Sequence, residues 1–158
     1  MRINWKVLII SLAIVYGISF VGSLFTSSTV NSDWYDSVKP SITSPNWVFP
    51  VVWNILFFLI ALSLYFAWTS TRKKDKSTKK RIAIIFGINL FLNVAWSFLF
   101  FRIQNPLWAF FELIVLWFSI ISMLVLTWRI KKLSFYFLIP YSLWVSFAGI
   151  LNWLIAFG

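Results

Sequence analysis

Side chains able to do acid–base or metal chemistry are scarce in this sequence. Its 158 residues include no His and no Cys, and its only carboxylates are Asp33, Asp36, Asp75 and Glu112. Without imidazoles and thiols the chain cannot form a disulfide, a Ser-His-Asp triad or a thiolate or imidazole metal site, so we expect no metal. Two carboxylates could act together only at Asp33 and Asp36, which share a polar segment with Lys39. A two-carboxylate enzyme is therefore a minor alternative.

Polar and aromatic side chains recur at helical spacing in three apolar stretches. Spacings of three or four residues place such side chains on one face of a helix. The three stripes are Asn89, Asn93, Trp96 and Ser97; Tyr141, Trp144, Ala148 and Asn152; and Trp53, Asn54 and Phe57. Such a stripe either lines a ligand pocket or hydrogen-bonds a neighbouring helix, and the residue types leave both readings open.

These stripes belong to long apolar runs. Hydrophobic residues make up 61% of the chain and charged residues 11%, which is outside the usual range of soluble globular domains. Five runs contain one charged side chain in total, Glu112, and each is long enough to cross about 30 Å of hydrocarbon. We therefore predict an all-α integral membrane protein, a single domain of residues 1–158 folded as a bundle of five transmembrane helices at about 5–26, 46–71, 80–101, 106–129 and 133–157.

The first run has an alternative interpretation as a secretory signal. Arg2 and Lys6 precede it, and Gly22 and Ser23 offer small residues for cleavage. The run of residues 7–25 is longer than a typical signal core, so a retained first helix is favoured.

The distribution of cations predicts the orientation of the five helices. One side of the membrane would receive twelve Lys and Arg residues, and the other side would receive only Lys39 and Arg102. Because positive residues concentrate in cytoplasmic loops, we predict a multi-pass cell-membrane protein with its N-terminus inside and its C-terminus outside. The twelve are Arg2, Lys6, Arg72, Lys73, Lys74, Lys76, Lys79, Lys80, Arg81, Arg129, Lys131 and Lys132.

The basic run RKKDKSTKKR at residues 72–81 is best explained by the same rule. A loop between two membrane helices that carries this charge is typical of a topology signal in contact with anionic lipid. We therefore expect a lipid bilayer and no nucleic acid as its partner.

Glu112 is the one acid within a predicted span. It lies about one turn into the fourth run, and Arg102, across the short RIQNP turn, is the obvious partner. The alternative is an interfacial carboxylate that stays hydrated and has no chemical role.

Three segments carry a resemblance to a known family. They are WYDSVKPSITSPNWVFPVVW at 34–53, NLFLNVAWSFLFF at 89–101 and PYSLWVSFAGILNW at 140–153. In this order they resemble the signatures of the TspO/MBR family, the tryptophan-rich sensory proteins related to the mitochondrial translocator protein. The resemblance extends along essentially the whole chain.

The resemblance implies a five-helix bundle, usually a homodimer, with a pocket that opens toward the first loop. In the family this pocket binds porphyrins such as protoporphyrin IX and, in relatives, sterols and benzodiazepine-type drugs. The resemblance assigns ligand binding to Tyr35, Trp47, Phe49, Trp53, Asn89, Asn93, Trp96, Ser97, Trp144 and Ala148. It also makes Trp53 and Trp144 candidates for light-dependent porphyrin breakdown.

The function expected on this basis is that of a membrane receptor or sensor that binds porphyrin as a ligand between its helices and requires no cofactor. One alternative is a light-dependent porphyrin-degrading enzyme. Another is a transport or structural component without a saturable ligand site. A dimer could use Ala83 and Gly87, a pair of small residues four positions apart in the third predicted helix.

Two departures from the family pattern affect the first loop. The usual Pro-Pro pair is Ser44-Pro45 here, and the usual aromatic two residues after the first Pro is Ile42. The chain ends at Gly158 without the tail that carries a proposed cholesterol motif in animal relatives, so no sterol site is predicted.

Overall fold

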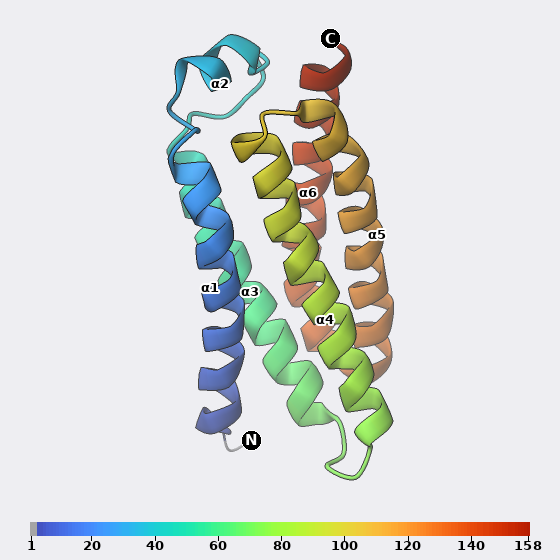
Figure 1. The fold of residues 1–158 in the computed structure, drawn as a ribbon. Helices are drawn as coiled ribbons and strands as arrows, with labels where there is room; N and C mark the ends of the chain where they lie inside the picture. The colour runs from blue at the N-terminus through green and yellow to red at the C-terminus, as the bar shows by residue number, and fades with distance from the viewer. Residues whose placement is uncertain (1–2) are drawn as a thin grey trace.

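A computed structural model describes residues 3–158. In these residues the chain forms five long α-helices, one short α-helix and one π-helical turn (Figure 1). Each long helix contains an apolar window sufficient to cross a membrane. The elements are α1 (Trp5–Ser27), α2 (Asp33–Val38), α3 (Val48–Ser70), α4 (Lys76–Ser97), η1 (Phe98–Arg102), α5 (Pro106–Ile130) and α6 (Lys132–Phe157).

Capping residues set several helix boundaries. Asp75 accepts a hydrogen bond from the Thr78 amide at 2.9 Å, so α4 begins at Lys76, four residues earlier than predicted. This bond lowers the pKa of Asp75, because the charged carboxylate is the better acceptor. Asn105 caps α5 in the same way, with Pro106 in the first turn. The remaining predicted ends of the long helices lie within two residues of those observed, if η1 is taken as the last turn of α4.

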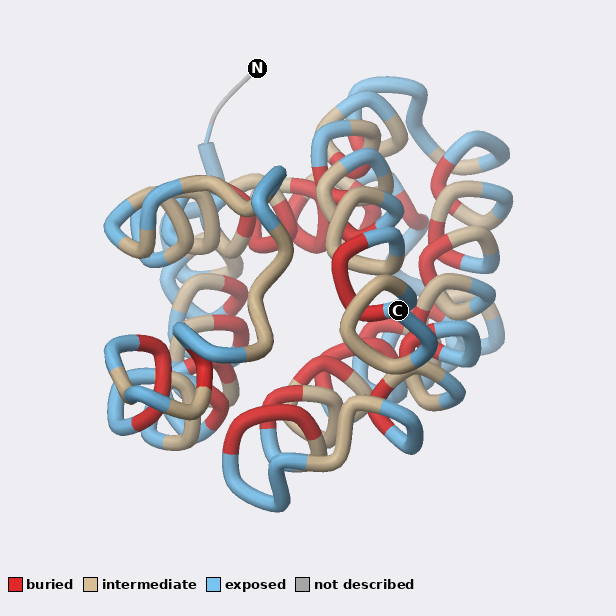
Figure 2. The backbone as a smooth tube through the Cα atoms, turned by 90° about the horizontal axis from the view of Figure 1, so that it is seen from above, coloured by how far each residue is buried: buried red, intermediate tan, exposed pale blue. Residues whose placement is uncertain are grey.

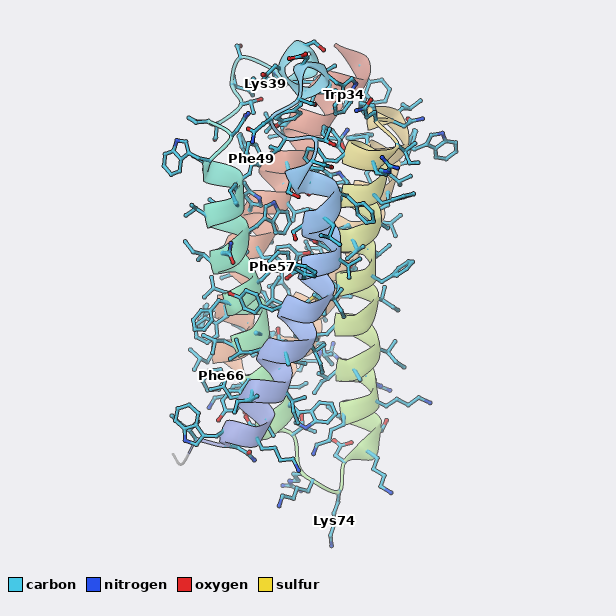
Figure 3. The ribbon with its side chains drawn as sticks, turned by 60° about the vertical axis from the view of Figure 1, so that its left-hand side comes forward. Trp34, Lys39, Phe49, Phe57, Phe66 and Lys74 are labelled. Carbon is cyan, nitrogen blue, oxygen red and sulfur yellow. The ribbon has the colours of Figure 1, made fainter. Side chains whose placement is uncertain are left out.

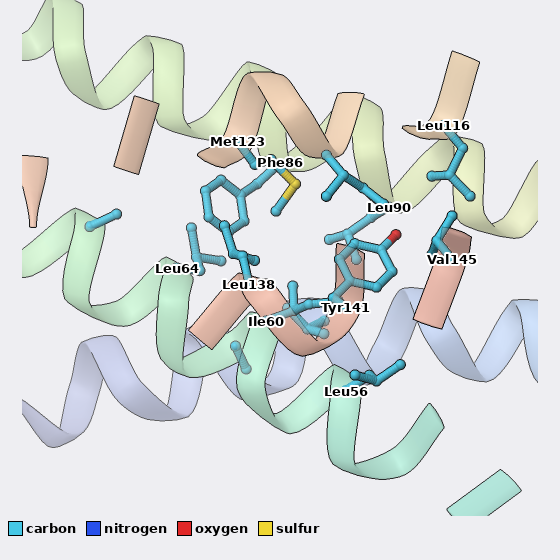
Figure 4. Close-up of a cluster of buried hydrophobic side chains, with 14 of the residues drawn as sticks. Leu56, Ile60, Leu64, Phe86, Leu90, Leu116, Met123, Leu138, Tyr141 and Val145 are labelled. Atoms are coloured by element: carbon cyan, nitrogen blue, oxygen red, sulfur yellow. The ribbon is translucent and has the colours of Figure 1, made fainter. Parts of the chain in front are cut away.

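The helices pack around a common interior, and the main neighbours are antiparallel except for α1 and α4, which both run from the end of the bundle with the N-terminus toward α2 (Figure 1). α1 contacts α3 and α4, while α6 contacts α5 and α3, and α4 contacts α5. Viewed from above, the buried backbone segments face inward and the exposed segments face outward (Figure 2). The centre contains large apolar side chains, among them Ile60, Phe86, Leu90, Met123 and Leu138 (Figure 4).

The exterior of the bundle is also apolar. Phe20, Phe91, Trp108, Phe118 and Leu143 each expose more than 60% of their area. A soluble protein rarely exposes so much contiguous apolar surface, whereas hydrocarbon chains cover it without cost. The five apolar helices and their apolar exterior are therefore those of a multi-pass membrane protein.

The polar segments gather at the two ends. The N-terminus, the α3–α4 loop and the α5–α6 junction share one end, whereas α2, the α4–α5 turn and the C-terminus share the other (Figure 1). Lys74 marks the first end and Lys39 the second (Figure 3). We call these the basic end and the α2 end.

Two elements were not predicted. Ser32 caps α2 through its hydroxyl, which accepts from the Tyr35 amide at 3.3 Å. The η1 turn widens the last turn of α4, and both Phe100 and Phe101 are buried there. Together these elements form an aromatic layer at the α2 end.

Candidate functional site

A cavity of about 580 Å³ lies between α1, α3 and α4 at the α2 end. This volume is within the range of pockets that hold drug-sized ligands. The lining residues are Tyr16, Ser19, Phe20, Gly22, Ser23, Thr26, Ser27, Val30, Asn31, Phe49, Pro50, Trp53, Asn54, Phe57, Asn93 and Ser97.

Aromatic rings of α3 form one wall of the cavity. Phe49, Trp53 and Phe57 are spaced four residues apart, so successive turns place them on one face. The Trp53 and Phe57 rings are stacked with centroids 5.2 Å apart. Figure 3 shows Phe49 near the α2 end and Phe57 deeper along α3. This wall offers flat, largely apolar surface to a ligand.

Two predicted residues of α4, Asn93 and Ser97, face the cavity. Asn93 Nδ2 donates to Tyr141 Oη at 3.4 Å, and that hydroxyl donates to Asn89 Oδ1 at 3.3 Å. Asn89 Nδ2 in turn donates to Ser119 Oγ at 2.8 Å. Asn89 therefore lies behind the wall and orients Asn93 through Tyr141.

Trp96 is directed into the bundle instead of lining the cavity. Its Nε1 donates to Asn152 Oδ1 at 3.1 Å, and its ring stacks on Phe100 with centroids 5.2 Å apart. Asn152 Nδ2 donates to the Pro106 carbonyl at 2.7 Å. These bonds tie α4, α5 and α6 together, which is the helix-bridging alternative for this part of the stripes.

The predicted residues of α6 also lie outside the cavity lining. Trp144 reaches only as far as Phe49, with ring centroids 5.8 Å apart, and Ala148 packs on the main core. The sequence-based argument placed the pocket between the second, third and fifth spans. In this cavity α1 supplies the third wall in place of the fifth span, because α1 packs against both α3 and α4.

The α1 wall was missed by the sequence analysis. It consists mainly of small and hydroxyl side chains, among them Ser19, Gly22, Ser23 and Thr26. Ser19 Oγ donates to the Tyr16 carbonyl at 3.0 Å and Ser23 Oγ to the Phe20 carbonyl at 2.7 Å. The signal was a stripe of hydroxyl residues at helical spacing in the first apolar run, which resembles ordinary helix packing.

Tyr35 connects α2 to the cavity wall. It is buried, and its ring centroid lies 6.5 Å from that of Phe49 and 5.9 Å from that of Phe101. Burial, with a smaller effect of the Asp36 charge, raises the pKa of Tyr35 to about 12. Its hydroxyl is therefore neutral at physiological pH. Trp47, by contrast, is 68% exposed and lies outside the cavity lining.

No charged side chain lines the cavity within residues 3–158. Lys39 pairs with Asp36 and lies over the Tyr35 ring, 5.9 Å from its centroid. Arg102 is exposed at the end of η1. The cations nearest to the site are thus placed around the α2 end, outside the cavity itself.

The expected pairing of Glu112 with Arg102 is wrong. Within the described chain, both Glu112 carboxylate oxygens are shielded from solvent and have no hydrogen-bond partner. Arg102 belongs to the widened η1 turn and remains exposed. The alternative of a hydrated carboxylate at the interface is not found either, because both oxygens are shielded from solvent.

Comparison with known proteins identifies the family of this chain. The model of the TspO/MBR family matches residues 9–157. The chain is 40% identical over 149 residues to the tryptophan-rich protein TspO of Archaeoglobus fulgidus, an alignment that covers 94% of each chain. It is 35% identical over 151 residues to TspO of Chlorobaculum tepidum, covering 93% of this chain and 94% of that one. It is 28% identical over 135 residues to the human translocator protein, covering 85% and 79%. The chain therefore belongs to the TspO/MBR family.

Proposed function

We propose that the protein is a membrane receptor or sensor that binds a porphyrin, such as protoporphyrin IX, in the cavity between α1, α3 and α4. The observation that carries the proposal is the aromatic wall of Phe49, Trp53 and Phe57 in a cavity of about 580 Å³. A flat macrocycle can stack on such rings. Asn93 and Ser97 on the facing helix offer polar contacts.

The carboxylates of the porphyrin would remain at the α2 end. An uncharged cavity disfavours a buried carboxylate, because a charge without a partner is costly to desolvate. Lys39 reaches the Tyr35 ring, and Tyr35 contacts Phe49 on the cavity wall. An ammonium group in this position can attract the acids while the macrocycle enters the cavity.

The residues present favour a metal-free porphyrin. His and Cys are absent from the sequence, so Tyr would be the nearest alternative as an axial ligand of haem iron. Tyr35 has a pKa raised to about 12, which disfavours the phenolate that iron binds best. Protoporphyrin IX should therefore bind at least as tightly as haem.

Tryptophan quenching tests this function directly. Protein in lipid nanodiscs is titrated with protoporphyrin IX and with haem. We expect saturable quenching that weakens in Trp53→Ala and persists in Trp108→Ala, since Trp108 is exposed on α5 and does not line the cavity. A strong preference for haem would contradict the metal-free model. A lack of saturation would favour the transport or structural alternative.

A second candidate function is the light-dependent breakdown of bound porphyrin. The placement of Trp53 on the cavity wall favours it, because a photoexcited macrocycle held against an indole has an oxidisable donor at contact distance. The chemistry would belong largely to the excited ligand and oxygen, and the protein would supply the position. Trp144 would act only through Phe49.

We also propose the orientation and the oligomeric state expected from the sequence, with the N-terminus inside and a homodimer in the membrane. The outer face of α4 supports the dimer, because Ala83 and Gly87 are both exposed there. A Cβ added at Gly87 would meet no atom within 4 Å. A second helix could thus approach this backbone closely.

A further inference from the structure

The cavity reaches the outside of the bundle between two helices. Six of its lining residues are exposed: Phe20, Ser23 and Ser27 of α1, Asn31 of the α1–α2 loop, and Pro50 and Asn54 of α3. Five of the six belong to α1 and α3, the two helices that flank the cavity on this side. We call this opening the α1–α3 gap, and Phe57 of α3, labelled in Figure 3, lines the cavity behind it.

The other sides of the cavity are closed by packing. Gly22 of α1 is buried, and a Cβ built on it would lie 3.7 Å from Val94 and Ser97 of α4. Toward α6, the Trp53 ring contacts that of Tyr141, with centroids 6.2 Å apart. Among the sides that face other helices, the α1–α3 gap is therefore the one on which the cavity opens, while the exposed Asn31 lies at its α2 end.

One hydrogen bond marks the lower edge of the gap. Tyr16 Oη donates to the Asn54 carbonyl at 3.0 Å. In the described chain, the other hydrogen bond between the α1 region and α3 runs from the amide of Asn4, the N-cap of α1, to Tyr65 Oη near the basic end. Beyond Tyr16, the α1 hydroxyls bond to carbonyls of their own helix. Within residues 3–158, no side-chain hydrogen bond joins α1 directly to α3 between Tyr16 and the end of α1. At the outer end, Asn46 just before α3 donates to the Val30 carbonyl at 2.9 Å and to Asn31 Oδ1 at 3.1 Å, which closes the top of the gap.

The position of the gap determines what can pass through it. Asn54 lies six residues into α3, about 9 Å below its start, and so within the apolar span. Its Nδ2 donates to the Pro50 carbonyl at 2.9 Å, and it exposes an amide where hydrocarbon is expected. An exposed amide at this depth is costly unless it meets a polar group, and a ligand that passes the rim can supply one.

We propose that the α1–α3 gap is a lateral entrance through which a lipid-dissolved ligand reaches the cavity, and that Tyr16 is a positioning residue that limits its width. The identity of the ligand as a porphyrin rests on the proposed function, whereas the route does not. Asn54 gives the passing ligand a polar contact at the rim. A large apolar molecule then never has to leave the bilayer for water, which the hydrophobic effect would oppose.

Thiol labelling tests the route without any porphyrin. Because the sequence has no Cys, Ser97→Cys places a single thiol on the cavity wall opposite the gap. In nanodiscs this thiol is labelled with an uncharged, lipid-soluble maleimide and with a sulfonated, water-soluble one. Each rate is normalised to that of Ser37→Cys, which is exposed in α2. We expect the lipid-soluble reagent to react at least about tenfold faster, since a fixed charge is excluded from the hydrocarbon.

Matched variants then locate the entrance. Ser23→Trp should slow the lipid-soluble reagent several-fold by filling the rim, whereas Leu24→Trp should not, because Leu24 is exposed on α1 but does not line the cavity. Tyr16→Phe should accelerate labelling. Tyr65→Phe, which removes the other α1–α3 bond, should leave the rate unchanged.

Equal rates for the two reagents, or an unchanged rate in Ser23→Trp, would overturn the lateral entrance. Transfer of protoporphyrin IX from donor vesicles provides the second arm, and Ser23→Trp should slow it while Leu24→Trp does not. If no porphyrin binds at all, the proposed function fails, and the thiol rates still decide the route. The two conclusions can therefore fail separately.

Discussion

Trp53 and Trp144 occupy different environments, although their sequence contexts make them look equivalent. Trp53 lines the cavity and stacks on Phe57. Trp144 does not line the cavity and contacts the wall residue Phe49, with ring centroids 5.8 Å apart. A ligand in the cavity can touch Trp53 directly, while contact with Trp144 requires side chains to rearrange. Any redox role of the two indoles should therefore be unequal.

Substitution by Phe separates stacking from electron donation at these positions. Phe keeps most of the stacking area, so Trp53→Phe and Trp144→Phe should each bind protoporphyrin IX within about tenfold of the parent. If the indole donates electrons, bleaching in light should fall sharply in Trp53→Phe and less in Trp144→Phe. Absorbance decay under constant illumination measures it. Bleaching at the parental rate in both variants would show that the indoles have no redox role and that the protein only binds the porphyrin.

Asn152 shows how single residues connect elements in this bundle. It is buried on α6, accepts a hydrogen bond from Trp96 of α4 and donates one to the Pro106 carbonyl of α5. Asn152→Leu keeps the volume but leaves the indole N–H and the carbonyl unpaired. The free energy of unfolding should fall by about 1–2 kcal/mol, the range of interhelical hydrogen bonds in membranes.

Reversible unfolding in mixed micelles measures this effect. Trp96→Phe removes the same donor, so the double variant should be less destabilised than the sum of the two single variants predicts. Simple additivity would show that Trp96 and Asn152 are not coupled in the membrane.

The long helices could be predicted from the sequence, and the short ones could not. An uninterrupted apolar run sets both the existence and the approximate ends of a span, because lipid leaves no alternative for its backbone. α4 begins earlier than its apolar run, because Asp75 caps a first turn of basic residues that hydropathy alone does not assign to a span. α2 has six residues and no apolar run of its own, and η1 differs from α4 only in its backbone hydrogen bonds.

Only part of the candidate site could be predicted from the sequence. A stripe indicates which residues share a face of one helix, but it does not indicate which neighbour that face meets. Phe49, Trp53, Asn93 and Ser97 face the cavity, while Asn89 and Trp96, on the same stripe of α4, bond to α5 and α6 instead. α1 was overlooked because the same pattern of Ser and Gly residues occurs in pocket walls and in contacts between packed helices.

The assembly of two chains can be tested on the outer face of α4. Ala83→Leu with Gly87→Leu adds bulk at two exposed positions and touches no residue of the cavity lining. We expect weaker dimerisation in detergent, because the added side chains keep the partner backbone at a distance. Ile84→Leu, an exposed position on the same helix, is the matched control. Sedimentation that shows an unchanged dimer would exclude this face of α4 as the interface.

The orientation of the whole molecule follows from the separation of its charges. The basic end carries Lys and Arg from the α3–α4 loop and the α5–α6 junction, and the α2 end carries Lys39 and Arg102. Moving several cations across the bilayer during insertion is unfavourable, so the basic end should stay inside. Thiol labelling of single-Cys variants in intact cells tests this orientation, because the sequence has no native Cys. An impermeant maleimide should not label Lys76→Cys and should label Ser37→Cys at the α2 end. Both thiols should react after lysis. Labelling of position 76 in intact cells, with position 37 protected, would invert the orientation and place the α2 end in the cytoplasm.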